Sequence, residues 1–339
     1  MALAKRAVVS DVKKISLVDY KIPEPKEDWV LVKVQAIPLC TQYKGWVKGT
    51  NSAGHEAAGE VVAVGPYSTK VKVGDRVVVM PGWPCGKCEL CIRGEYIHCQ
   101  HWHDYHEQTG LDFDGDTHVQ YLLKQDWLLA HIPDGVSYEK ASLACCGLGP
   151  TFGALERFKA SKFDTVLIIG AGPVGLGGIV NAKYRGCKVI SVDMIDYRKN
   201  LATELGADLV LDASDPEVNK KIMQFTGNKG VDIALEVSGS NPGARLGIDS
   251  LRRHGTMAFI GENEKIEIHV SRDLIRKGIQ ICGQWHYNIN GIPKIMDVIL
   301  NSPVVDKLIT HKYPMTDMDT AMAICASQKC GKVMIDPHK

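Results

Sequence analysis

The sequence predicts an α/β protein of two domains, in which a β-rich domain is followed by a doubly wound parallel sheet. Three observations support this prediction. The chain has 339 residues, the length of about two ordinary domains. Its first part contains short strand-like segments between Gly and Pro turns. From residue 164 onward, apolar strand-like segments alternate with segments of helical length.

The first predicted domain covers residues 1–149. Strand signals lie at residues 30–36, 60–64 and 76–80, where β-branched and other apolar residues are enriched. Gly and Pro turn signals separate these segments. The tail from residue 307 returns to mixed polar and apolar segments, so we expect residues 300–339 to rejoin this domain.

The second predicted domain covers residues 150–299. Apolar strands that alternate with helices indicate a parallel sheet with helices on both faces, because each strand is then buried on two sides. The expected strands are residues 165–169, 188–192, 231–235 and 255–260, and the expected helices are residues 173–184 and 198–205.

The composition argues against two classes of protein. The 40 basic and 39 acidic residues give a net charge of +1, so the chain lacks the basic excess of a nucleic-acid-binding protein. No apolar run approaches the length that spans a membrane, and the N-terminus lacks the apolar stretch of a signal peptide. We therefore expect a cytoplasmic protein that binds neither nucleic acid nor membranes.

Four cysteines with the spacing C-x2-C-x2-C-x7-C are the most informative feature of the chain: Cys85, Cys88, Cys91 and Cys99. A tetrahedral zinc ion needs four converging soft ligands, and one short loop can supply them. A site filled entirely by protein ligands is typical of structural zinc. The alternatives are a disulfide-bonded loop or a chance cluster of buried thiols. The odd total of eleven cysteines and the expected reducing compartment favour zinc.

Residues 166–175 read V-L-I-I-G-A-G-P-V-G, the strand, glycine-rich turn and helix start of a dinucleotide site. The positive end of the helix would face the pyrophosphate. The alternative is a glycine-rich turn in another α/β fold. The residues expected to contact the cofactor are Gly170, Gly172, Pro173, Val174 and Gly175.

Asp193 ends the next predicted strand, where a carboxylate would bond both ribose hydroxyls. The same charge would repel the 2′-phosphate of NADP, so NAD is the expected cofactor. Arg198 is a counter-argument, because an arginine nearby can hold that phosphate. Its other reading is an ordinary charge on a helix surface, which we favour.

A second set of ligand-type residues has an ordinary reading when each is taken alone. Cys40, Cys145 and Cys146 could be core residues, and His55 could be a loop histidine. The motifs around them nevertheless occur in a recognisable order. They are G-H-E-x-x-G at 54–59, G-D-R-V at 74–77, the four-cysteine loop, G-x-G-x-x-G at 170–175, G-V-D-I-A-L-E at 230–236, L-I-T-H at 308–311 and G-K-V-M-I at 331–335. With these motifs, the chain resembles the zinc-containing medium-chain dehydrogenase/reductase family, which includes alcohol, sorbitol and threonine dehydrogenases.

The resemblance implies a GroES-like catalytic domain, a Rossmann domain, and an active site in the cleft between them. It implies NAD and two zinc ions per chain, one structural and one catalytic. Cys40 and His55 would bind the catalytic zinc, and Glu56 would be a direct or alternate ligand. Cys146 matches the third ligand of the alcohol dehydrogenase branch, whereas the sorbitol branch uses the glutamate and water. Lys332 matches a basic residue near the cofactor phosphates.

Two departures from the family pattern affect the expected chemistry. The family usually places a hydroxyl two residues after the first ligand, as the start of a proton relay, but Gln42 stands there. An amide does not titrate, so Thr41, Tyr43 or water would take over, or the relay differs. The segment between Cys40 and His55 is also short, which predicts a wide, polar substrate mouth, with Tyr43, Lys44 and Trp46 as candidate lining residues.

The function predicted from these features is a reversible, NAD-dependent oxidation of a secondary alcohol or polyol to a ketone. One alternative is a primary alcohol or aldehyde reductase with the same zinc machinery. Another is a scaffold that binds zinc and NAD without catalysis. The expected partners are a small-molecule substrate and further copies of the chain, as a homodimer or homotetramer. The histidine-rich residues 98–106 are read as a polar loop rather than a third metal site.

Overall fold

The computed structural model describes residues 2–111, 113, 115–263 and 265–339, and it divides into two compact units. Unit 1 consists of Met1–Cys146, Asn288–Leu300 and Ile309–Lys339. Unit 2 consists of Gly147–Tyr287 and Asn301–Leu308. Among the described residues, no helix is both long enough and apolar enough to cross a membrane.

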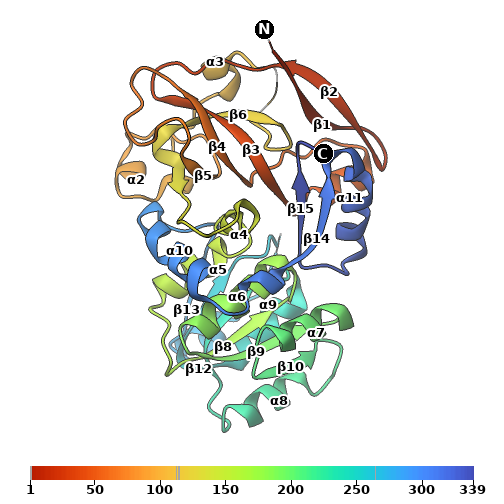
Figure 1. Cartoon of the computed structure of the whole chain (residues 1–339). Helices are drawn as coiled ribbons and strands as arrows, with labels where there is room; N and C mark the ends of the chain where they lie inside the picture. Colours follow the sequence, from red (N-terminus) through yellow and green to blue (C-terminus); the bar gives the residue numbers. More distant parts are fainter. Residues whose placement is uncertain (1, 112, 114, 264) are drawn as a thin grey trace. The chain divides into compact units, whose positions relative to one another are not determined.

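Unit 1 is built on a β-hairpin and a larger sheet (Figure 1). The hairpin pairs β1 (Leu3–Asp11) with β2 (Lys14–Lys21), and the sheet has the order β14-β15-β3-β4-β5-β7, with β6 also paired to β3. Its strands are β3 (Trp29–Leu39), β4 (Ala57–Val64), β5 (Arg76–Val79), β6 (Tyr121–Gln125), β7 (Leu129–His131), β14 (Ile309–Pro314) and β15 (Lys332–Asp336). All of its pairs are antiparallel except β14 with β15. The alternation of apolar residues along β3 places Val30, Val32 and Val34 in the core.

Short helices fill the connections of unit 1: α1 (Tyr43–Lys48), α2 (Glu89–Ile92), α3 (Tyr105–Thr109), α4 (Tyr138–Ser142), α10 (Ile292–Asn301) and α11 (Met318–Ser327). Two have side-chain caps that satisfy free N–H groups of the first turn. Asp104 accepts from the N–H of Glu107 in α3, and Ser137 accepts from the N–H of Lys140 in α4. Helix α1 ends at Gly49, whose φ of 71° suits glycine.

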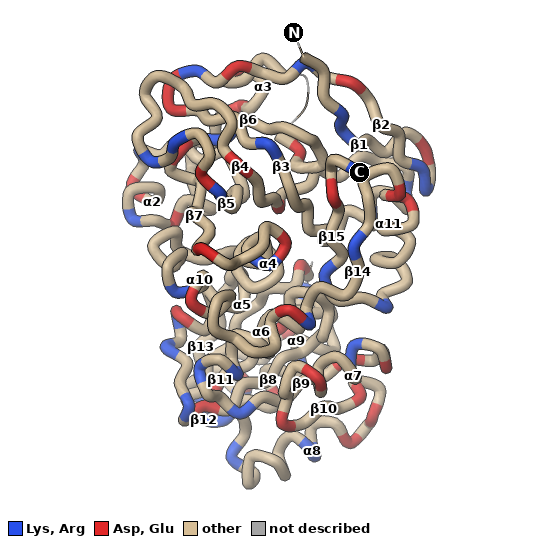
Figure 2. Tube along the Cα trace, viewed as in Figure 1, with Lys and Arg blue, Asp and Glu red and all other residues tan. Residues whose placement is uncertain are grey.

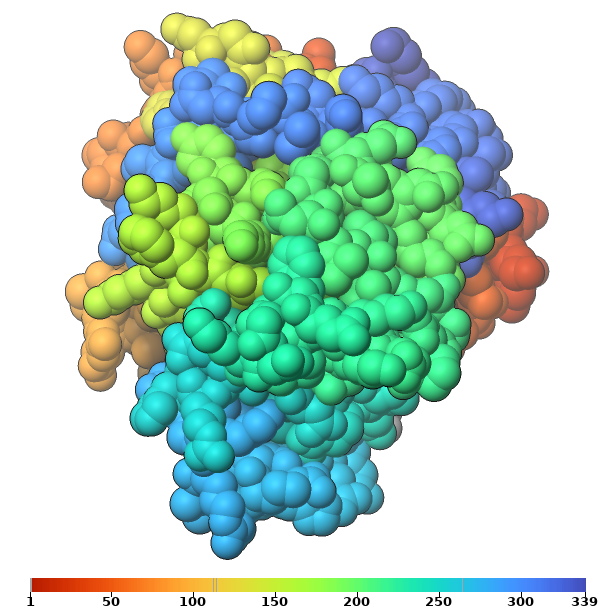
Figure 3. Space-filling model, turned by 90° about the horizontal axis from the view of Figure 1, so that it is seen from below, coloured from red at the N-terminus to blue at the C-terminus, as the bar shows by residue number. Residues whose placement is uncertain are grey.

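Unit 2 contains a six-stranded parallel sheet with the order β10-β9-β8-β11-β12-β13. The strands are β8 (Thr165–Ile169), β9 (Lys188–Asp193), β10 (Leu209–Asp212), β11 (Val231–Glu236), β12 (Leu251–Phe259) and β13 (Gln280–Gly283). The helices are α5 (Gly149–Arg157), α6 (Pro173–Tyr184), α7 (Asp196–Glu204), α8 (Val218–Phe225) and α9 (Asn241–Ser250). The central strands are buried almost completely, as expected for a sheet covered on both faces. The predicted fold class is therefore confirmed, and Figure 3 shows the green-to-cyan surface of this unit.

The unit boundaries differ in detail from those expected from the sequence. Residues 288–299 fall in unit 1, because Ile289 donates its N–H to Gly94 O (2.9 Å) and the Asn288 amide donates to Arg93 O (2.8 Å). Residues 301–308 fall in unit 2, where Lys307 donates to Glu204 O (3.2 Å). Residues 147–149 also belong to unit 2, and α5 begins at Gly149. These contacts depend on partners far away in the sequence, which a local pattern does not reveal.

Charged residues are spread over both units. Figure 2 shows Lys and Arg segments interspersed with Asp and Glu segments along the trace. This distribution agrees with the net charge of +1.

The glycine turn of unit 2 gives a first prediction. A Cβ at Gly175 would lie 1.8 Å from the backbone oxygen of Gly170, whereas a Cβ at Gly178 in the same helix would meet side-chain atoms at 3.1 Å and beyond. We expect Gly175→Ala to lower the thermal-unfolding midpoint and to weaken NAD binding, with a stability loss of about 1–3 kcal/mol. Gly178→Ala is the matched control and should have a much smaller effect in calorimetry and titration. Equal losses for both variants would contradict this reading of the turn.

Candidate active site and metal centres

The four-cysteine loop of unit 1 brings its sulfur atoms together as predicted from the spacing. The four ligand atoms of Cys85, Cys88, Cys91 and Cys99 lie within 4.8 Å of one another. Sulfur–sulfur distances of 3.5, 3.6 and 3.9 Å link them. A tetrahedron with zinc–sulfur bonds of about 2.3 Å has sulfur–sulfur edges of about 3.8 Å. The loop therefore has the dimensions of a closed zinc site.

Backbone N–H groups already point at these sulfur atoms. Cys85 donates its N–H to Cys99 Sγ (3.3 Å), and Cys88 donates its N–H to Cys85 Sγ (3.4 Å). Hydrogen bonds to backbone N–H groups lower the pKa of Cys88 to about 6, which favours its thiolate. Because zinc binds the thiolate form, this arrangement supports metal binding.

The second ligand set assembles from three separate segments of unit 1. Cys40 follows β3, His55 and Glu56 precede β4, and Cys146 follows α4. One ligand atom from each of the four residues lies within 4.8 Å of the others. His55 Nε2 is 3.2 Å from Cys146 Sγ, and the Cys146 thiol hydrogen-bonds with that of Cys40. The set of two sulfurs, an imidazole and a carboxylate suits zinc.

Glu56 is fully buried and has partners for both of its carboxylate oxygens. Oε1 forms an ion pair with Lys332, and Oε2 accepts from the N–H of Cys146 (3.1 Å). Burial raises the pKa of Glu56, although the charge of Lys332 opposes the shift. In this arrangement the carboxylate supports the ligand Cys146 and keeps its own charge balanced.

Lys332 lies beside the second ligand set. Its side chain is 1% exposed, and its ammonium contacts Glu56 and Leu39 O (3.2 Å), whereas its expected place near the cofactor phosphates stays a prediction. A buried ammonium needs a compensating charge, and Glu56 provides it. Burial alone would lower the pKa of Lys332, but Glu56 and the neighbouring thiols outweigh burial and raise it.

The charges around Cys40 favour its thiolate. The hydrogen bond from Cys146, together with Lys332 and His55, holds the pKa of Cys40 well below its usual range despite burial. Burial would lower the pKa of His55, but the hydrogen bond to Cys40 and the charge of Glu56 raise it. The cluster is thus poised to exchange protons for a metal cation.

Gln42 and Trp46 have places that the sequence did not reveal. Gln42 is 2% exposed, and its amide lies between the two candidate ligands, 2.7 Å from Cys40 N and 3.2 Å from His55 Nδ1.

Trp46 is buried and donates its indole N–H to Asp319 (2.8 Å), so it packs in α1 and does not line an open mouth. Thr41 and Lys44 are exposed.

Asp116 is a further residue that the sequence analysis missed. Its carboxylate is buried and accepts from the N–H of Gly54 (2.6 Å), directly before His55, and from the N–H of His118 (2.9 Å). A single Asp in a polar loop has no distinctive sequence signal, because most such residues are solvated.

The glycine turn of unit 2 has the form expected for a dinucleotide site. Gly170 has a φ of 93°, and Pro173 and Val174 open α6 directly after Gly172. Asp193 is 8% exposed, and its carboxylate accepts from the N–H groups of Ala171 (2.6 Å) and Ile195 (2.9 Å).

The side chain of Arg198 lies beside the glycine turn. Its guanidinium is 3.8–3.9 Å from the position of a Cβ on Gly172, and its buried Nε has no hydrogen-bond partner among the described residues. A guanidinium with an unpartnered Nε beside a helix N-terminus fits an anionic or hydroxyl-rich ligand.

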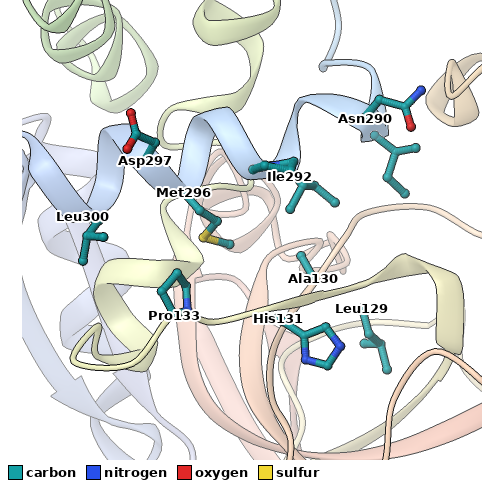
Figure 4. A pocket seen from close by; sticks show the side chains of 11 residues that line it. Leu129, Ala130, His131, Pro133, Asn290, Ile292, Met296, Asp297 and Leu300 are labelled. Carbon is teal, nitrogen blue, oxygen red and sulfur yellow. The ribbon is translucent and has the colours of Figure 1, made fainter.

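A separate hollow of about 620 Å³ in unit 1 lies between β7 and α10 (Figure 4). Its walls include Leu129, Ile292 and Met296, with His131 and Asp297 as polar groups. It contains no member of either ligand set among its lining residues.

Comparisons with known proteins agree with this geometry. Residues 26–134 match the family described as alcohol dehydrogenase GroES-like domain, and residues 173–301 match the family described as zinc-binding dehydrogenase. The chain is 32% identical to sorbitol dehydrogenase of Bacillus subtilis (strain 168), over 99% of this chain and 98% of that protein. It is 32% identical to L-threonine 3-dehydrogenase of Pyrococcus horikoshii, over 94% of each chain.

Among solved structures, benzyl alcohol dehydrogenase from Acinetobacter calcoaceticus superposes with a TM-score of 0.88 at 26% identity, over 99% of each chain. This neighbour shares the two-part architecture over nearly its whole length. With that level of identity to the sorbitol and threonine enzymes, the chain belongs to the zinc-containing medium-chain dehydrogenase/reductase family.

Proposed function

We propose that this chain is a zinc- and NAD-dependent dehydrogenase that reversibly oxidises a secondary alcohol or polyol to a ketone. One observation carries the proposal: Cys40, His55, Glu56 and Cys146 place a mixed ligand set around one point, apart from the closed four-cysteine loop. A mixed set of this kind is typical of catalytic zinc, which keeps a position open for substrate or water.

Cys146 is the proposed third ligand, with Cys40 and His55. Its sulfur is 3.2 Å from His55 Nε2, whereas the nearest Glu56 oxygen is 4.0 Å from that nitrogen. Both oxygens of Glu56 already have partners, in Lys332 and the N–H of Cys146. Moving the carboxylate to the metal would break the buried ion pair, so Glu56 is better placed as an alternate ligand.

The proposed mechanism gives each residue a separate task. Cys40, His55 and Cys146 would hold a zinc ion, which would supply Lewis-acid chemistry, and the glycine turn would hold NAD, which would supply the hydride acceptor. The thiolate of Cys40 is favoured and contributes negative charge to the site, and Lys332 compensates the Glu56 carboxylate beside it. Gln42 is buried and cannot titrate, so the alcohol proton leaves through water or the exposed Thr41 hydroxyl.

NAD is the proposed cofactor, because Asp193 sits at the end of β9 beside the glycine turn. Its carboxylate would bond the adenosine ribose and repel a 2′-phosphate. Arg198 lies near Gly172 and would meet the cofactor's phosphate groups from the other side of the turn.

The polyol preference rests on the short segment between Cys40 and His55, whose exposed residues include Thr41, Lys44 and Asn51. Polar groups at the mouth suit hydroxyl-rich substrates, which are costly to bury without partners. The name of the Bacillus subtilis relative, sorbitol dehydrogenase, also supports a polyol.

A primary alcohol or aldehyde reductase is the second candidate, and the similarity to benzyl alcohol dehydrogenase favours it. A scaffold without catalysis is disfavoured, because packing alone needs neither the two ligand sets nor the glycine turn. We further propose a homodimer or homotetramer in the cytoplasm. β13 is the last strand of its sheet in the part of the chain that the structure describes, so it offers an edge for pairing, and both clusters need reduced thiols.

The proposal predicts two zinc ions per chain, which elemental analysis of protein purified without chelators should count. Cys85→Ser should remove the structural ion and lower stability, and Cys146→Ala should remove the catalytic ion and nearly all turnover, with NAD binding retained. Cys145→Ala is the matched control: Cys145 is buried beside Cys146, its thiol donates to Val79 O (3.4 Å), and it should keep both ions. One zinc in the native protein, or two in Cys146→Ala, would argue against these assignments.

The preference for NAD over NADP tests the proposed role of Asp193. Asp193→Ser should raise the ratio of kcat/KM for NADP to that for NAD by at least tenfold, about 1.4 kcal/mol, because the repulsive charge is gone. Asp196→Ser changes an exposed carboxylate nearby on α7 and should leave the ratio unchanged. If the native enzyme used both cofactors equally, Arg198 would become the determinant.

The catalytic efficiency on different alcohols tests the proposed polar mouth of the substrate site. We expect kcat/KM for sorbitol or inositol to exceed that for ethanol and 2-butanol by at least tenfold, about 1.4 kcal/mol of transition-state discrimination. NADH formation at 340 nm reports all four reactions. Equal or better activity on the simple alcohols would refute the polyol preference and leave the dehydrogenase assignment intact.

A further inference from the structure

Gln42 makes three polar contacts around the proposed catalytic metal centre. Its Oε1 accepts from the N–H of Cys40 (2.7 Å), and its Nε2 lies 3.4 Å from Ala53 O and 3.2 Å from His55 Nδ1. The side chain is 2% exposed. One buried amide therefore touches both segments that carry Cys40 and His55.

This contact set is not explained by helix capping. Gln42 is the N-cap residue of α1, but its side chain makes no capping hydrogen bond to that helix. The amide turns instead toward the ligand segments. The buried amide therefore contacts the segments of Cys40 and His55 and not the free N–H groups of α1.

The ring of His55 lies between Cys146 and Gln42. His55 Nε2 is 3.2 Å from Cys146 Sγ, and His55 Nδ1 is 3.2 Å from the amide nitrogen of Gln42. Among the polar contacts of the described residues, the Gln42 amide is the group that Nδ1 meets.

A second group holds the same segment from the other side. Asp116 accepts from the N–H of Gly54 (2.6 Å), and a Cβ on Gly54 would lie 2.5 Å from Thr117 Oγ1 and 2.7 Å from the His118 ring. The peptide that carries His55 is thus fixed between Gln42 and Asp116. Its freedom to adapt to an altered Gln42 is small.

We infer that Gln42 is a positioning residue of the proposed catalytic metal centre, whose buried amide holds the segments that carry Cys40 and His55 in place. The inference rests on the proposed zinc site. Partners of this kind typically change metal affinity by roughly 10- to 100-fold when removed.

The test measures zinc affinity by competition with a chromophoric chelator, and the four-cysteine site provides an internal reference. Gln42→Leu keeps the size but removes the acceptor, and it should weaken one of the two zinc sites by roughly 10- to 100-fold. Gln42→Glu keeps the acceptor and should retain affinity close to that of the native protein or tighter. With cobalt(II) in place of zinc, Gln42→Leu should alter the absorption bands of the mixed-ligand site, whereas Gln125→Leu should alter only those of the four-cysteine site.

Gln125 supplies the matched control, because it is also a buried glutamine of unit 1. Its amide donates to Pro84 O (2.7 Å), directly before the four-cysteine loop. Gln125→Leu should affect the four-cysteine zinc and leave the other ion unchanged. Far-UV circular dichroism of each variant separates loss of fold from loss of a metal site.

The outcomes are distinguishable. If Gln42→Leu and Gln42→Glu both bind zinc like the native protein, or lose it equally, the inference is wrong. If the native protein holds no second zinc at all, the proposed function fails instead.

Discussion

The buried ion pair between Glu56 and Lys332 is the interaction on which the mixed ligand set of unit 1 depends. The two residues are 276 positions apart in the sequence, and both side chains are almost fully buried. Leaving either charge alone in the core would cost several kcal/mol, so each requires the other. Lys332 also donates to Leu39 O at the end of β3, next to Cys40. The C-terminal strand therefore completes the surroundings of the metal ligands.

This dependence explains why the tail returns to unit 1. β15 pairs with β3, which in turn pairs with β4, so the strands that carry Lys332 and Leu39 and the segment that leads into Glu56 come together. The positive charge of Lys332 also lowers the pKa of Cys40, whose thiolate would otherwise be opposed by burial. A chain shortened before β15 would lose a strand and the counter-charge of the site together.

The sequence predicts the parts whose signals are local. The strand at residues 165–169 and the helix at residues 173–184 match β8 and α6 residue for residue, because apolar runs end at glycine turns there. The four-cysteine loop is equally local. By contrast, the burial of Lys332, the amide orientation of Gln42 and the place of residues 288–299 depend on contacts between distant segments. Side-chain identity alone does not fix such partners, since each residue has a common solvated alternative.

The two ligand sets differ in how much of the fold each one needs. The four-cysteine loop spans residues 85–99 and carries its own N–H donors, so its sulfurs converge with little help from elsewhere. The second set draws on residues 40, 55–56 and 146, and on the support of Gln42 and Lys332. A closed site can be local because it needs only stability. An open site must hold an incomplete coordination sphere against collapse, and that requires rigid support from several strands at once.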